Sequence, residues 1–159
     1  MKLSLLLILM AGTAFPQAKP QDVIGWGKIK WGMTITEARS VYPSATGDGT
    51  RERLTLEPIQ VGELLLNVSV SGRTGSDRIA RVELSSMDGS FRRFDRLKVL
   101  LMQKYGPPID ESTRLEDANT TVTTLIWTFP SASILLTLRQ GRVIELEYLV
   151  TDDEALGLL

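Results

Sequence analysis

Apolar residues recur at helical spacing in an early segment of the chain, behind a helix-start signal. Thr34 and Glu37 form an S/T-x-x-E capping box, with Met33 and Ala38 placed to pack across it. One face of the segment is apolar, and its residues are Ile35, Ala38, Val41 and Tyr42. Because Pro43 cannot continue a helix, the pattern predicts a first helix over 35–42.

A later segment predicts a longer helix between Ser90 and Gly106. Its apolar face consists of Phe94, Leu97, Leu101 and Tyr105. Ser90 is placed to cap the start, and Gly106 occupies the stop position with two prolines behind it.

Apolar and polar residues alternate with the period of a β-strand in six further segments. These are residues 53–59, 63–71, 78–85, 121–129, 133–138 and 142–150. In the last of them Ile144, Leu146 and Tyr148 share one face, while Glu145 and Glu147 lie on the other. Short turns at Gly62 and 72–77 favour an antiparallel meander.

The elements together predict an α+β fold: a two-layer sandwich in which two helices pack on one antiparallel sheet. Pro43 precedes Arg78 by 35 residues (78 − 43), and Pro107 precedes Arg142 by 35 (142 − 107). This spacing predicts a tandem α-β-β-β repeat, with units at 29–89 and 90–159 after an arm at 15–28. A second capping box, Thr151 with Glu154, predicts a short C-terminal helix.

The first residues predict export. Lys2 precedes an apolar run from Leu5 to Met10, and small residues follow, so 1–14 (or 1–18) is typical of a cleavable signal peptide. The run is too short to span a bilayer. "LMAGT" at 9–13 nearly matches the bacterial lipoprotein box, but Thr13 stands where the lipid-bearing cysteine would. We therefore expect a periplasmic or secreted bacterial protein with no membrane span and no lipid anchor.

The amino-acid composition excludes several kinds of partner and functional site. The chain has 18 Lys and Arg against 19 Asp and Glu, a net charge of −1, which does not favour a nucleic-acid partner. It has no cysteine and no histidine. Disulfides, thiolate sites and the commonest general base are thus excluded, and no cofactor or metal is expected.

The segment "IKWGMTITEARSVYP" at 29–43 resembles the "G-M-[ST]-x-x-E-V" helix start of small outer-membrane-assembly lipoproteins of the BamE (SmpA/OmlA) type. The tandem helix-plus-meander plan also resembles the secreted beta-lactamase inhibitory proteins. The chain lacks the lipid-bearing cysteine of the first family and the disulfide cysteines of the second. The resemblance implies the two-layer fold and a role in protein binding, and it assigns no functional residues.

Several motifs offer alternatives to simple packing. "GWGKIKWGMTITE" at 25–37 lacks the spacing of a phosphate-binding loop, and we interpret it as a helix start. Trp26 is a candidate aromatic contact for a ligand, whereas Trp31 and Trp127 fit a core. Glu145 and Glu147 lie roughly 7 Å apart by strand rise, a spacing that glycoside hydrolysis allows and a solvated strand face explains equally.

The sequence therefore favours a non-enzymatic envelope protein that acts through contact with an unknown protein. The alternatives are a carboxylate-type hydrolase of cell-wall polymer and a small-ligand or glycan-binding module. The predicted partner surface is the outer side of the second helix, because apolar residues there lie beside two arginines. Its members are Arg92, Arg96, Val99, Leu100 and Gln103.

Overall fold

A computed structural model describes residues 22–47, 53–73 and 75–151. The predicted signal peptide at 1–14 and the C-terminal helix beginning after Thr151 lie outside these residues. In the described part, strands predominate over helices, and the fold is α+β with an antiparallel sheet, as the sequence predicted.

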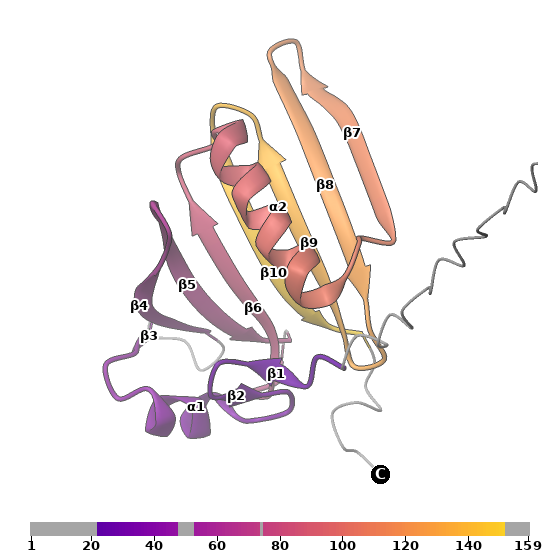
Figure 1. Ribbon diagram of the computed structural model, residues 1–159. Coiled ribbons are helices and arrows are strands. Elements are labelled where there is room, and N and C mark those ends of the chain that lie inside the picture. The colour runs from indigo at the N-terminus through magenta and orange to yellow at the C-terminus, as the bar shows by residue number, and fades with distance from the viewer. Residues whose placement is uncertain (1–21, 48–52, 74, 152–159) are drawn as a thin grey trace, which may run out of the picture.

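The sheet contains eight strands in the order β3-β4-β5-β6-β10-β9-β8-β7 (Figure 1). The strands of its first half are β3 (Thr46–Gly47), β4 (Arg53–Val61), β5 (Leu64–Gly72) and β6 (Ile79–Ser86). Those of its second half are β7 (Asp110–Asp117), β8 (Thr120–Thr128), β9 (Ala132–Arg139) and β10 (Val143–Val150). All neighbours are antiparallel, and β6 and β10 meet at the centre with Val82 opposite Tyr148.

The helices are α1 (Ile35–Val41) and α2 (Phe91–Tyr105). The capping box of α1 is confirmed, because the Thr34 hydroxyl accepts from the Glu37 N–H and the Glu37 carboxylate accepts from the Thr34 N–H. α1 ends one residue before the predicted Tyr42, which occupies the C-cap. Ser90 and Gly106 occupy the two caps of α2, but the Ser90 side chain makes no capping hydrogen bond.

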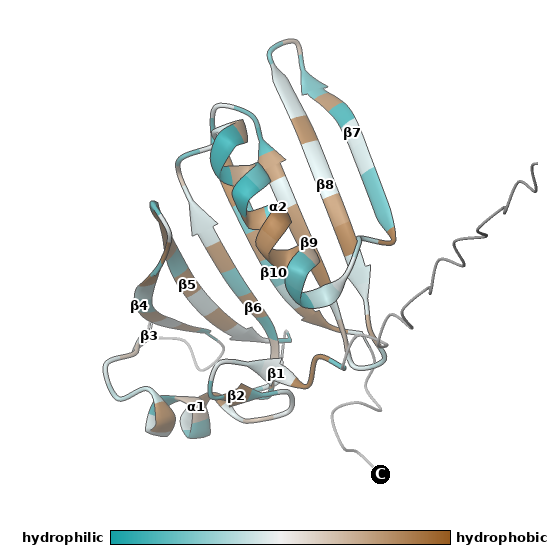
Figure 2. Ribbon diagram, viewed as in Figure 1, coloured by the Kyte–Doolittle hydropathy of each residue, from teal (hydrophilic) through white to brown (hydrophobic). Residues whose placement is uncertain are grey.

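One face of the sheet carries the core. The alternation predicted for 142–150 is confirmed, since Ile144, Leu146 and Tyr148 are buried and Glu145 and Glu147 are half-buried. α2 lies across this core face and buries Phe94, Leu97, Leu101 and Tyr105, as predicted (Figure 1). Figure 2 shows the corresponding mixture of hydrophobic and hydrophilic residues along α2.

Three features were not predicted. β7 adds a fourth strand after α2, where the sequence predicted three, and all eight of its residues are exposed. Figure 2 shows it as a largely hydrophilic strand. The end of the predicted arm at 15–28 and the residues directly after it form a hairpin of β1 (Gly25–Trp26) and β2 (Ile29–Lys30). The two-residue strand β3 pairs with β4 at the edge of the sheet. The alternation of apolar and polar residues cannot predict two-residue strands such as β1, β2 and β3. It also cannot predict β7, because neither face of that strand lies in the core.

Neither α1 nor α2, the helices of the described residues, is long and apolar enough to cross a membrane.

Candidate functional site

The outer side of α2 carries the five residues predicted as a partner surface, and all five are exposed. We call this set the α2 outer face: Arg92, Arg96, Val99, Leu100 and Gln103. Val99 is 52% exposed and Leu100 42%, so neither widens the buried stripe of the helix. Two further exposed apolar side chains, Phe91 and Met102, lie on the same helix. The helix therefore presents apolar area to solvent while its opposite side holds the core.

The basic residues of α2 differ in whether they form ion pairs. Arg93 pairs with Asp88, and Lys98 bonds both carboxylate oxygens of Glu111 at 2.8 and 2.9 Å. Arg92 and Arg96 have no ion-pair partner among the residues that the structure describes. Two guanidinium groups are thus open to a carboxylate from outside.

The Arg96 side chain lies against the turn between β4 and β5. A Cβ on Gly62 would lie 3.2 Å from Arg96 Nε, so the guanidinium approaches the turn where a side chain is missing. Arg92 and Arg96 also line a crevice of about 20 Å³ with Val61 and Leu64. The α2 outer face is therefore continuous with the β4–β5 turn.

The stretch 25–37 forms the β1–β2 hairpin and then the start of α1. Gly27 and Gly32 adopt positive φ angles of 58° and 79°, which favour glycine. Arg78 donates to the Gly32 carbonyl at 2.9 Å, fixing the helix start against β6. The interpretation of this stretch as a helix start agrees with the structure, because its glycines form turns and its polar residues cap α1.

The tryptophans are placed differently from one another. Trp127 is 1% exposed and donates from Nε1 to the Gly106 carbonyl at 2.9 Å, so it belongs to the core as predicted. Trp31 is half-buried and donates to the Val23 carbonyl at 2.6 Å. Trp26 is also half-buried and packs against the core from β1. Its role as a ligand contact stays a prediction.

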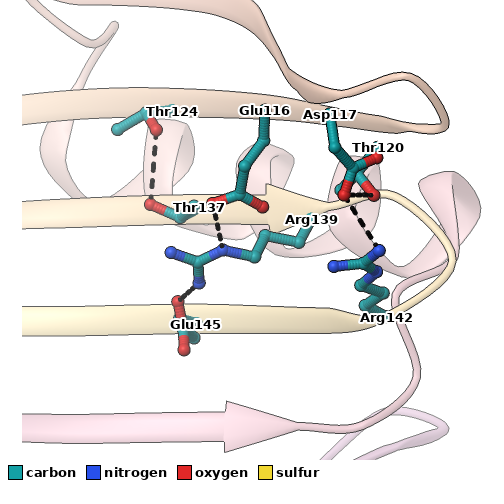
Figure 3. Close-up of polar contacts among 8 residues, drawn as sticks. All are labelled: Glu116, Asp117, Thr120, Thr124, Thr137, Arg139, Arg142 and Glu145. Carbon is teal, nitrogen blue, oxygen red and sulfur yellow. Dashed lines mark hydrogen bonds and ion pairs between the residues drawn. The ribbon is translucent and has the colours of Figure 1, made fainter.

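The sheet face opposite α2 carries a network of ion pairs over β7–β10 (Figure 3). Arg139 on β9 bonds Glu145 on β10 and, at 3.4 Å, Glu116 on β7. The neighbouring carboxylate of Glu145 raises the pKa of Arg139 above its ordinary value. Beside this cluster, Arg142 bonds Asp117 at 3.1 Å. The Asn119 N–H and the Thr120 hydroxyl lower the pKa of Asp117. These charges neutralise one another across the strands.

Glu145 and Glu147, the carboxylates considered for hydrolysis, are both engaged in this face. Glu145 pairs with Arg139, and Glu147 pairs with Arg81 on β6. Paired with arginines on a half-exposed face, these two glutamates have the arrangement of a solvated charge network.

Sequence reasoning missed the arginine partners of this network. The alternation of Arg81 with Glu83 and of Glu145 with Glu147 was a usable signal, because opposite charges on adjacent strands pair. Within 22–47, 53–73 and 75–151, no group of three or more potential ligands is placed to hold a metal ion.

Comparison with known protein families, curated proteins and solved structures finds no match to this chain.

Proposed function

We propose that this protein is an exported component of a bacterial cell envelope that works by binding another protein, without catalysis. It would be periplasmic or secreted, released from its leader at 1–14 or 1–18 and free of a lipid anchor because the chain has no cysteine. The leader pattern and the absence of cysteine support this location.

The observation that carries the proposal is the α2 outer face. Interfaces combine apolar contact area with arginine more often than other surfaces do. Val99 and Leu100, 52% and 42% exposed, supply the apolar area. Arg92 and Arg96 supply two guanidinium groups that form no ion pair with any described residue. The face rests on a helix fixed by four core residues, so it is rigid before binding, which lowers the entropy cost of association.

The charge of the face points to an acidic partner. Asp95 is exposed on the same helix, and the exposed Glu63 lines the crevice with Arg92 and Arg96, but neither carboxylate forms an ion pair with these arginines. Arginine binds carboxylates in a bidentate manner that lysine cannot reproduce. The partner we propose therefore offers Asp or Glu around an apolar patch.

We also propose that the fold is a two-layer sandwich built by duplication, with the helices forming one layer. The strand order supports this, because β3–β6 and β7–β10 run in from opposite edges to the central β6–β10 pair. The resemblance to the BamE-type and beta-lactamase-inhibitory families belongs with this proposal and agrees with a binding role.

Crosslinking in the native envelope tests the binding surface. A tagged chain is compared with a variant carrying Arg92→Glu, Arg96→Glu, Val99→Ser and Leu100→Ser. The control carries Arg114→Glu and Leu115→Ser, an exposed arginine and an exposed apolar residue on β7. Circular dichroism should show all three chains folded, since none of the changed side chains is in the core.

We expect the α2 variant to lose the crosslinked species and the β7 variant to keep it. Retention by the α2 variant and loss by the β7 variant would place docking on the edge strand instead. Incubation with cell-wall polymer provides a second check. Turnover that disappears in Glu145→Gln would contradict a non-catalytic role.

A further inference from the structure

A hollow with a volume of about 370 Å³ lies between the β1–β2 hairpin and the C-terminal end of α2. This size falls within the range of small-molecule sites. Its apolar lining consists of Ile24, which is 65% exposed, and of the largely buried Val23, Ile29 and Tyr105. The two lysines Lys30 and Lys104 also line it. The hollow thus combines apolar surface with cations supplied by two segments far apart in the sequence.

Hydrogen bonds fix the strand side of this hollow. Asp22 accepts from the Ser131 N–H at 3.0 Å and from its hydroxyl at 2.6 Å, which ties the chain before β1 to the turn between β8 and β9. Trp31 Nε1 donates to the Val23 carbonyl at 2.6 Å. At the hairpin tip, the Lys28 N–H donates to the Tyr42 hydroxyl at 3.0 Å. The walls are therefore held in position without a ligand.

A glycine brings the two hairpin strands close together beside the hollow. A Cβ on Gly25 would lie 2.1 Å from the Ile29 carbonyl oxygen, a distance that no side chain allows. The hairpin backbone can pack this tightly only with glycine at this position, which keeps the side of the hollow formed by β1 and β2 compact.

Positive charge is in excess at the hollow. Neither Lys30 nor Lys104 has an ion-pair partner in the described part of the chain. Lys104 Nζ lies 4.9 Å from the ring centroid of Tyr105, so a cation–π contact places this ammonium group at the aromatic wall. Among the described residues that line the hollow, Asp22 is the one carboxylate, and its oxygens already accept bonds from Ser131 and the Val23 N–H.

We propose that this hollow binds a small carboxylate with an apolar body. The carboxylate would pair with Lys30 and Lys104, and the apolar body would lie against Ile24 and over the largely buried Val23, Ile29 and Tyr105. The site is separate from the α2 outer face and does not depend on the protein-binding proposal. It also differs from the aromatic site suggested by Trp26, which is not among the lining residues.

Titration calorimetry of the purified chain with octanoate tests the site. The positive charges are removed by Lys30→Met and Lys104→Met, which keep an unbranched side chain. They are retained in the variants Lys30→Arg and Lys104→Arg. The matched control is Lys28→Met, because Lys28 is an exposed lysine at the hairpin tip that does not line the hollow. Octan-1-ol tests whether the carboxylate itself is recognised.

We expect octanoate to bind, and the Lys30→Met/Lys104→Met double variant to bind about tenfold more weakly. The arginine variants and Lys28→Met should bind as the unchanged chain does, and octan-1-ol should bind more weakly than octanoate. The proposal is overturned if octanoate does not bind at millimolar concentration, or if octan-1-ol binds equally well. It is also overturned if Lys28→Met weakens binding as much as the double variant.

Discussion

The two halves of the sheet follow the same path but are covered in different ways. In each half a helix is followed by an edge strand and then by three strands that approach the centre, where β6 pairs with β10. α1 has seven residues and α2 has 15, while the edge strands β3 and β7 have two and eight. The same order of elements therefore accommodates helices of very different length.

Local stop signals set these lengths. Pro43 follows α1 almost directly, whereas the chain after Ser90 reaches Gly106 before it meets a glycine or proline. As a result α1 buries only Ile35 and Ala38, whereas α2 buries four side chains, two of them aromatic. The core of the first half is completed by side chains from the hairpin region, among them Trp26, Trp31 and Met33.

The comparison shows two ways of stabilising a helix in this fold. A helix of seven residues is too short to be stable on its own and depends on its ends, which agrees with the complete capping box of α1. A helix of 15 residues with a continuous buried face depends on that face, which agrees with the missing side-chain bond at Ser90. The predictions that follow test this division.

The largest loss of stability should come from truncating a side chain on the buried face of α2. Leu97 is 4% exposed in the core, and Leu97→Ala should lower the free energy of unfolding by about 3 kcal/mol, through lost burial and a cavity. Val99→Ala, two residues away and 52% exposed, should change it by less than about 0.5 kcal/mol. Urea denaturation measures both. Equal small effects would show that α2 is not held by its core face.

The sequence predicted those parts of the fold in which one face meets the core. Periodicity placed both helices and the strands β4, β5, β6, β8, β9 and β10, because burial imposes a pattern on residue choice. β7 was missed because all its residues are exposed, so that pairing with β8 and surface ion pairs hold it instead of a core face. The β1–β2 hairpin did carry a signal, since Gly27 and Lys28 form a two-residue loop with glycine first.

The two candidate sites also differ in whether a local sequence pattern could predict them. A helical projection needs only local geometry, and the five residues it placed on the outer side of α2 are exposed in the structure. That a partner binds there stays a prediction. The hollow between Lys30 and Lys104 joins segments far apart in the sequence, so no local pattern could predict it.

A smaller loss of stability is expected at the helix starts, and it should be larger for α1 than for α2. Thr34→Ala removes a hydroxyl that accepts from the Glu37 N–H at 3.2 Å and should cost about 1 kcal/mol. Ser90→Ala removes no capping bond and should cost no more than a few tenths of a kcal/mol. Thermal and urea unfolding compare the pair. If Ser90→Ala proved the more costly, α2 rather than α1 would depend on its cap.

The smallest effect concerns the charge of the α1 cap and depends on pH. The Thr34 N–H, followed by its hydroxyl, lowers the pKa of the Glu37 carboxylate below its ordinary value. A lowered pKa in the folded state stabilises the fold above the unfolded pKa of about 4.3, and this contribution is lost as pH falls through the folded-state pKa. Glu37→Gln removes this titration but keeps an acceptor for the cap.

The stability difference between the unchanged chain and Glu37→Gln should therefore be greatest near neutral pH and shrink below about pH 4. Urea midpoints at pH 7 and pH 3 measure it, and comparing two chains cancels the acid sensitivity of Asp22 and Asp117, whose pKa values are also lowered. Leu97→Ala is the control, because its cost comes from packing and should not change in the same direction. A difference that widens on acidification would mean that the ionised carboxylate does not stabilise the start of α1, and that the short helix depends on its packing just as α2 does.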